Sequence, residues 1–293
     1  MSGATDETSG PRGGLAAPSF DCLWCGRPHT PRAADDLEAF AMLCPDCIGR
    51  AQDNEFLRFR LREGLRARAA ATAAPPDTEA QMKAYYAARA PEYDQVYAGV
   101  GLPPVERAVF QADLDAATMW LDALPLSGEI VELAAGTGWW SPLLAQKGEL
   151  WLYDVVEEPL ELARQRLVAH GLRAHIHVRD AWAEPDRQVD ALFTGFWLSH
   201  VRSARLVEFL SLVKRWLKPG GTFAFIDEAP GADYTPTIDE RQPRRLGDGR
   251  EFTITKVYRA REVFESPLRE AGFGRIKLAA TNRHFVMGHA TVP

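Results

Sequence analysis

Four cysteines give the clearest sign of chemistry in this sequence. Cys22 and Cys25 have two residues between them, as do Cys44 and Cys47, and eighteen residues separate the two pairs. This spacing is typical of a structural zinc site, because each pair forms a tight turn that presents two sulfurs and Zn²⁺ binds four thiolates in a tetrahedron. Four thiolates fill the coordination shell, so the pattern predicts a structural zinc rather than a catalytic one.

Other interpretations of the cysteines stay open. Two disulfides would require an oxidising compartment, and a redox function would need only one of the two pairs. His29 is also placed to replace one thiolate as a zinc ligand. No cysteine follows Cys47, so chemistry in the rest of the chain does not use a cysteine nucleophile.

A second group of residues follows short apolar runs further along the chain. Residues 131–138 read VELAAGTG, and Gly136 and Gly138 allow the backbone there to approach a ligand closely. The helix expected to follow adds free N–H groups at its N-terminus. Asp154 and Asp180 each end one of the next two apolar runs. If these runs are parallel strands, their ends meet at the edge of the sheet where open α/β sheets bind ligands.

The order of these features resembles the class I S-adenosylmethionine-dependent methyltransferases over about residues 80–293. The resemblance implies an α/β fold with a doubly wound, mostly parallel sheet of seven strands, the last of them antiparallel. It also implies which residues bind the cofactor. These are Glu132, Gly136 and Gly138 around its methionine part, Asp154 at the ribose, Val155 beside the adenine, Asp180 and Ala181 at the adenine amine, and Phe196 after the fourth strand. Ala134 departs from the family, which has glycine at this position.

Aromatic residues and one histidine complete the implied site. The segment from Tyr85 to Asp94 is similar to the leading helix of the family, whose aromatic side chains cover the methionine end of the cofactor. We therefore expect Tyr86 and Tyr93 to line the site, with packing of the same face on the sheet as the alternative. His200, just after the fourth strand, is the candidate general base, which is needed only if the acceptor must lose a proton. A structural histidine is the alternative there.

The sequence favours a small-molecule methyl acceptor. Enzymes that methylate exocyclic base amines resemble one another in an Asn/Asp-Pro-Pro-Tyr motif, whereas residues 194–197 read TGFW, and cytosine C5 methylation needs a cysteine nucleophile. Residues 228–250 are the predicted lid over the acceptor. They contain Arg241, Arg244 and Arg245, and we hypothesise an anionic acceptor because guanidinium groups suit carboxylate or phosphate. A solvated loop is the alternative.

Three other functions remain open. Residues 49–73 contain six arginines and three acids, which form either a solvated helix face packed on the zinc module or a contact to nucleic acid. The second interpretation would make the chain an RNA or protein methyltransferase docked through the zinc module. A cofactor sensor or scaffold with the same fold is another. A nicotinamide-dependent oxidoreductase is disfavoured, because Ser141 stands where the third glycine of the dinucleotide-binding pattern belongs.

The elements that must position these residues alternate along the chain. Strands are predicted at 129–134, 149–154, 174–179, 189–194, 222–227, 251–258, 275–280 and 284–289, and helices at 49–73, 139–147, 158–170, 203–217 and 260–272. Such alternation is typical of βαβ units with helices on both faces of a parallel sheet. The predicted organisation is a disordered tail at 1–19, a zinc-binding module with the Arg-rich helix at 20–73, a linker at 74–79 and the methyltransferase-like domain at 80–293.

The composition of the chain limits which classes of protein and partner are possible. The 293 residues are 46% hydrophobic, which suffices for a sizeable core, and the net charge of −6 predicts no chain-wide affinity for nucleic acid or anionic membranes. A local basic surface stays compatible with this charge. No apolar run approaches the roughly 18 residues of a membrane span, and the polar start of the chain does not resemble a secretory signal. We therefore expect a cytoplasmic protein with no membrane partner, and nothing in the sequence selects an oligomeric state.

Overall fold

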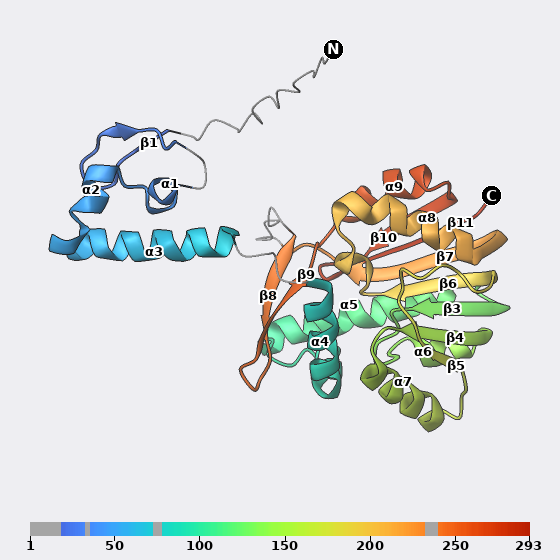
Figure 1. The fold of residues 1–293 in the computed structure, drawn as a ribbon. Coiled ribbons are helices and arrows are strands. Elements are labelled where there is room, and N and C mark those ends of the chain that lie inside the picture. The colour runs from blue at the N-terminus through green and yellow to red at the C-terminus, as the bar shows by residue number, and fades with distance from the viewer. Residues whose placement is uncertain (1–18, 33–35, 73–77, 232–239) are drawn as a thin grey trace, which may run out of the picture. The chain divides into compact units, whose positions relative to one another are not determined.

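The chain forms two compact units, residues 1–76 and residues 77–293 (Figure 1). The computed structural model describes residues 19–32, 36–72, 78–231 and 240–293. The disordered tail predicted at 1–19 and the linker predicted at 74–79 fall mostly outside these described residues.

The first unit is small and built from short elements. In chain order they are β1 (Phe20–Asp21), β2 (Pro28–His29), α1 (Leu37–Ala41), α2 (Pro45–Gly49), a 3-10 turn (Ala51–Asp53) and α3 (Glu55–Thr72). The helix predicted at 49–73 therefore begins later, at Glu55. Asn54 explains this start, because its side-chain oxygen accepts the backbone N–H of Leu57 at 3.1 Å and caps the first turn.

Helix α3 packs against α1 and covers the cysteines. Gly64 is required at the crossing, because a Cβ there would lie 2.8 Å from Ala41. Leu57, which is 1% exposed, joins the core around the cysteines. Leu61 also packs against this core, whereas Phe56 and Phe59 are exposed.

The second unit is organised around a seven-stranded sheet with the order β10-β11-β7-β6-β3-β4-β5 (Figure 1). The strands are β3 (Glu129–Leu133), β4 (Glu149–Asp154), β5 (His175–Val178), β6 (Val189–Gly195), β7 (Leu217–Glu228), β10 (Gly274–Ala280) and β11 (Phe285–Thr291). Strands β3 to β7 pair in parallel, whereas β11 pairs antiparallel with both β7 and β10. The predicted seven-stranded, mostly parallel sheet with an antiparallel last strand is confirmed.

Helices cover both faces of this sheet. They are α5 (Pro104–Ala123), α6 (Ser141–Ala145), α7 (Glu157–Ala169), α8 (Leu206–Trp216) and α9 (Glu265–Glu270). A further helix, α4 (Thr78–Arg89), packs beside α7, and 3-10 turns lie at Ala90–Gln95, Leu198–His200, Ser203–Arg205 and Arg261–Phe264. Neighbouring strand residues point to opposite faces. Ile130 therefore packs with α5, α6 and α7, and Val131 packs with α8 and α9. Strands buried on both faces are expected for a parallel sheet.

A separate hairpin stands beside α4. Strand β8 (Arg241–Arg245) pairs antiparallel with β9 (Glu251–Thr255). The hairpin is tied to α4 by a 2.7 Å hydrogen bond from the backbone N–H of Thr253 to the Gln81 side chain, and by the rings of Tyr85 and Phe252, 5.6 Å apart. The lid predicted at 228–250 thus contains a strand at 241–245, and its residues 232–239 lie outside the described part. The strand predicted at 251–258 ends at Thr255.

The membrane prediction is tested only for helices. Within the described ranges, no helix combines the length and the apolar character needed to cross a membrane. The cytoplasmic location stays a prediction.

Candidate active site and metal centre

A pocket of about 220 Å³ opens where the strands β3, β4, β5 and β6 end. Helix α4 and the residues after it supply the opposite wall. The pocket is lined by eight of the predicted cofactor-binding residues and by the predicted base: Tyr86, Tyr93, Gly136, Asp154, Val155, Asp180, Ala181, Phe196 and His200. The structure therefore brings residues from six separate segments into one space.

The aspartate at the end of β4 organises the loops around the pocket. One carboxylate oxygen of Asp154 accepts the backbone N–H of Gly136 at 2.9 Å, and the other accepts that of Val156 at 2.9 Å. Burial raises the pKa of this carboxyl, and the two backbone N–H groups oppose that rise. Each oxygen keeps a further lone pair for a ligand. Asp154 thus fixes the glycine loop and its own loop against each other.

Two of the predicted cofactor-binding residues lie behind the pocket instead of lining it. Glu132 is 1% exposed and accepts a 2.5 Å hydrogen bond from the Ser141 hydroxyl. Burial raises its pKa to about 8, although that hydrogen bond opposes the rise. Gly138 leaves no room for a side chain, because a Cβ would lie 2.6 Å from the Cβ of Ala163 on α7. Both residues support the loop from the side that faces away from the pocket.

The loop also contains the one departure from the family pattern. Ala134 has φ of +53°, in the left-handed region that favours glycine. The backbone conformation expected for glycine is therefore kept, and the alanine adopts it with strain. Gly136, with φ of +55°, has no atom within 4 Å of the position a Cβ would take, so this residue does face open space.

Helix α4 reaches across the pocket at two points. Lys83 lies 3.3 Å from the Asp180 carboxylate, whose other oxygen accepts the backbone N–H of Trp182 at 3.0 Å. The hydroxyl of Tyr86 lies 2.7 Å from Nε2 of His200. Lys83 was missed from the sequence, because a lysine on an amphipathic helix carries no signal of its own.

The buried His200 has a defined tautomer. Its Nδ1 lies 2.7 Å from the carbonyl oxygen of Thr255, which only accepts, so Nδ1 carries the proton. Its Nε2 therefore accepts the hydroxyl proton of Tyr86. Burial, with help from the positive charge of Lys256, lowers the pKa of His200 well below its usual range. The imidazole is neutral, and its available lone pair points at Tyr86.

A second compartment, of about 110 Å³, shares Tyr86, Tyr93 and Phe196 with the pocket. Its remaining walls come from α4, the end of β7 and the hairpin: Arg89, Val96, Glu228, Arg244, Ile254, Lys256 and Tyr258. Of the three arginines singled out from the sequence, only Arg244 lines it. Arg89 and Lys256 gave no sequence signal, since only the fold brings segments so distant in the chain together.

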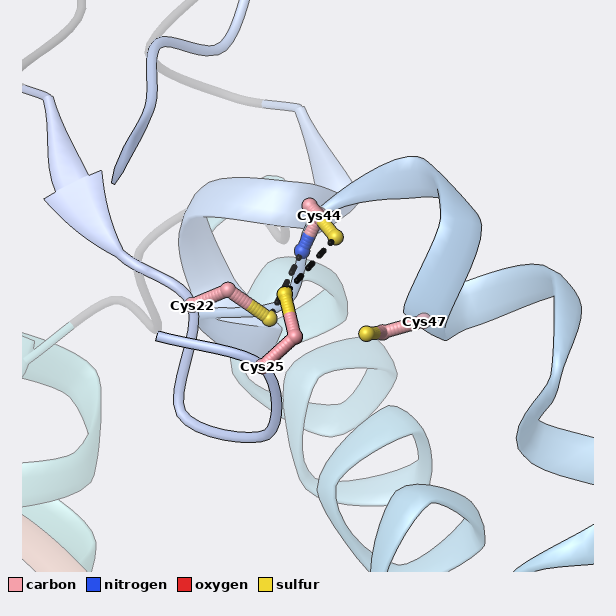
Figure 2. Close-up of side chains that lie close together, drawn as sticks. All are labelled: Cys22, Cys25, Cys44 and Cys47. Atoms are coloured by element: carbon pink, nitrogen blue, oxygen red, sulfur yellow. Dashed lines mark hydrogen bonds between the residues drawn. The ribbon is translucent and has the colours of Figure 1, made fainter. Parts of the chain in front are cut away.

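The four cysteines of the first unit converge as predicted from their spacing (Figure 2). All four sulfurs lie within 4.8 Å of one another, and none forms a disulfide. The backbone N–H of Cys44 donates to the sulfur of Cys22 at 3.4 Å, and the Cys25 and Cys44 sulfurs are 3.7 Å apart. A zinc tetrahedron with Zn–S bonds of about 2.3 Å has sulfurs roughly 3.8 Å apart, so the arrangement fits zinc. His29 is instead bonded to Glu38, at 2.6 Å.

Comparison with known proteins indicates methyltransferase relatives for the second unit. Residues 130–221 match the family model described as a methyltransferase domain. The ubiquinone/menaquinone biosynthesis C-methyltransferase UbiE of Azotobacter vinelandii is 29% identical over 118 residues, which is 38% of this chain and 46% of that protein. The chain thus spans less than half the length of this relative. The Pseudomonas putida UbiE is 26% identical over 189 residues, 54% of this chain and 70% of that protein.

Solved structures extend the similarity over most of the second unit. A DhpI–SAH complex is 27% identical with a TM-score of 0.60, and the match covers 75% of this chain and 100% of that one. A DhpI–SAM–HEP complex is 27% identical with a TM-score of 0.61, over 74% of this chain and 99% of that one. Taken with the sheet order and the matched segment, these similarities show that the second unit has the fold of class I methyltransferases and support an S-adenosylmethionine-dependent methyltransferase.

Proposed function

We propose that this protein transfers a methyl group from S-adenosylmethionine to a small-molecule acceptor. The observation that carries the proposal is the convergence of Asp154 and Asp180, from neighbouring strands, on one pocket that is roofed by Tyr86 and Tyr93 from the α4 side. The cofactor supplies an activated methyl group on a sulfonium. The protein's main task in such a displacement is alignment and exclusion of water, which can supply about 7–11 kcal/mol.

Each pocket residue has a role in this proposal. The free lone pairs of Asp154 receive the ribose hydroxyls, with Val155 beside the adenine. Asp180 and Ala181 bind the adenine amine, and Lys83 must release or share the Asp180 carboxylate when they do. The open face at Gly136 admits the amino-acid end of the cofactor. Phe196 forms the wall between the cofactor and the second compartment.

The small size of the second compartment supports a small acceptor. It holds about 110 Å³ beside the rings that it shares with the cofactor pocket, a volume that fits a small molecule. An acceptor there has its reacting atom beside Tyr86, Tyr93 and Phe196. If that atom carries a proton, Tyr86 takes it while the Tyr86 phenolic proton passes to Nε2 of His200.

The first unit has a different role in the proposal. Cys22, Cys25, Cys44 and Cys47 bind one Zn²⁺, which cross-links the β1–β2 hairpin to the start of α2. A unit with so few buried residues cannot hold its fold by hydrophobic packing alone. The metal is structural because four thiolates leave no coordination position for a substrate.

Transfer of a labelled methyl group tests the function. The full chain is incubated with methyl-labelled S-adenosylmethionine and a cell extract, and label is measured in small-molecule, protein and nucleic-acid fractions. We expect label in the small-molecule fraction. Label confined to RNA or protein would overturn the acceptor class and would assign the first unit to docking, and absence of cofactor binding by calorimetry would overturn the function itself.

A matched pair of variants ties the activity to the pocket. Asp154→Asn removes the charge that accepts two backbone N–H groups, and we expect cofactor affinity to fall at least about tenfold. Asp122→Asn makes the same change at an exposed residue of α5 and should leave affinity unchanged. Equal effects of the two variants would contradict the assigned pocket.

A further inference from the structure

The second compartment has an unbalanced set of charges. Three cations line it, Arg89, Arg244 and Lys256, together with a single carboxylate, Glu228. Glu228 forms an ion pair with Lys256, which also donates to the Ser199 hydroxyl at 2.9 Å. The Glu228 carboxylate is therefore already paired with Lys256. Among the residues that the structure describes, the walls carry an excess of two positive charges.

The two guanidinium groups have no carboxylate within 4.0 Å among the described residues. Arg244 donates to the backbone carbonyl of Pro243 and the side chain of Gln242, each at 3.0 Å, and lies 3.5 Å from the Tyr258 hydroxyl. Arg89 donates to the Tyr85 hydroxyl and lies against the face of the Tyr93 ring, 5.4 Å from its centre. All these partners are neutral, so both positive charges are left without a counter-charge in a partly enclosed space.

Charged groups nearby do not cancel this excess. Asp227 adjoins Lys256, but its two oxygens accept the backbone N–H groups of Ser199 and Glu228, at 2.8 and 2.7 Å. It lies behind the wall instead of lining the compartment. Counting it still leaves a net positive charge. Positive groups that are partly withdrawn from water bind an anion more strongly than the same groups fully exposed to water.

We propose that this compartment, enclosed by Arg89, Arg244 and Lys256, binds an oxyanion of the methyl acceptor. The guanidinium fork matches the paired oxygens of a carboxylate or a phosphate-like group. The proposal rests on the proposed methyl transfer, since the compartment and the cofactor pocket share Tyr86, Tyr93 and Phe196. The acceptor is thus a small anionic molecule, held by its anionic group while its reacting atom faces these rings.

The hairpin provides its own control residue. Arg245 follows Arg244 on β8, so its side chain points to the other face of the hairpin. It is exposed and does not line the compartment. The sequence alone grouped Arg241, Arg244 and Arg245 as equivalent candidates. The structure distinguishes Arg244 from Arg245 by the alternation of the strand.

Protection of individual arginines from phenylglyoxal tests the proposal. The full chain is treated with the reagent in inorganic phosphate, in acetate or in chloride at equal ionic strength, with and without S-adenosylhomocysteine, and modification of each arginine is followed by mass spectrometry. We expect phosphate or acetate to slow modification of Arg89 and Arg244 about tenfold, as charge-assisted hydrogen bonds imply. Modification of Arg245 should not change. The phosphate and acetate arms distinguish a tetrahedral anion from a carboxylate.

Variants complete the test. Arg244→Ala should abolish the protection of Arg89, and Arg245→Ala should preserve it. Calorimetric binding of S-adenosylhomocysteine confirms that both variants are folded and separates the two proposals. Equal protection of Arg245, or no protection in either salt, would overturn the oxyanion site even if the cofactor analogue binds. Loss of analogue binding with protection intact would instead overturn the methyl-transfer proposal.

Discussion

The Tyr86 hydroxyl donates a 2.7 Å hydrogen bond to Nε2 of His200, because the other ring nitrogen of that histidine is committed to the Thr255 carbonyl. A histidine that faced the acceptor directly would need Nε2 free. Here the phenol stands between the histidine and the two spaces that it helps to line. The base predicted from the sequence therefore acts, in our proposal, through a tyrosine.

Replacement of Tyr86 by phenylalanine tests that relay. The variant keeps the ring wall and removes the proton that passes to His200, so for a protonated acceptor we expect kcat to fall about a hundredfold, the lower range for general base catalysis. Affinity for S-adenosylhomocysteine should stay the same. Tyr97→Phe is the matched control, because Tyr97 is also buried and aromatic, packing on Trp139 outside both spaces. An unchanged kcat in Tyr86→Phe would contradict the proposed transfer of a proton from Tyr86 to His200.

The raised pKa of Glu132 predicts how the stability of the cofactor-free protein changes with pH. The pKa of Glu132 is about 8 in the folded chain against an ordinary value of 4.5, so the folded state binds more protons between these pH values. The free energy of unfolding therefore falls as pH rises from about 5 to 8. Glu132→Gln removes this contribution. Urea unfolding at several pH values should show a shallower decline for the variant, and equal slopes would contradict the assignment.

The left-handed conformation of Ala134 predicts a stabilising substitution. A non-glycine residue there costs roughly 1–2 kcal/mol, while glycine adds about 0.4–1 kcal/mol of unfolded-state entropy. Ala134→Gly should therefore raise the free energy of unfolding by up to about 1 kcal/mol. Ala135→Gly, next in the chain and without a positive φ, should lower it. Thermal unfolding of the two variants checks the opposite signs, and destabilisation by both would count against strain at Ala134.

Alanine substitutions at the two glycines of the loop should have different effects on stability and on cofactor affinity. Gly138→Ala places a methyl group 2.6 Å from Ala163, so we expect a large loss of stability, of about 1–3 kcal/mol. Gly136→Ala meets no atom within 4 Å, and its methyl group would project into the space assigned to the cofactor. Its φ of +55° adds backbone strain like that at Ala134, so Gly136→Ala should lose less stability than Gly138→Ala, which adds a clash to the strain, but more cofactor affinity. Paired unfolding and binding measurements distinguish the two, and similar profiles would contradict the division between support and lining.

Zinc content provides a prediction for the first unit. We expect one zinc per chain by elemental analysis, lost in Cys44→Ser because three thiolates bind the metal much more weakly. His29→Gln should keep the metal, since His29 contacts Glu38 instead of the sulfurs. Zinc loss in the histidine variant would restore His29 as a ligand. A protein with no zinc and two disulfides after purification without reductant would overturn the metal site.

The central sheet was predictable because each strand is a short apolar run whose length and turn signals are local. The convergence of the four cysteines was predictable for the same reason, since C-x2-C spacing is a local property. The hairpin at 241–255 and its contact with α4 were not, because the bond between Gln81 and Thr253 joins segments far apart in the chain. Residues 104–123 form a helix that we did not predict.

The residues of the candidate site also differ in whether a local sequence signal could reveal them. Asp154 and Asp180 were recognisable because a carboxylate at a strand end occupies a topologically fixed place. Arg89 and Lys256 were not recognisable from the sequence. These charged residues line one compartment only because the hairpin packs on α4. Glu132 and Gly138 were predicted around the methionine part of the cofactor, and neither of them lines the pocket itself. Sequence order alone does not separate a residue that touches a ligand from one that supports its neighbour.

The confinement of all four cysteines to residues 22–47 also divides the chain by its sensitivity to oxidants. Peroxide and thiol-modifying reagents attack thiolates, and residues 48–293 offer none. With zinc bound as we propose, mild oxidation of the four cysteines therefore ejects the metal from the first unit, whereas the second unit has no thiol to oxidise and meets the same peroxide only at weaker targets such as Met82 in the pocket.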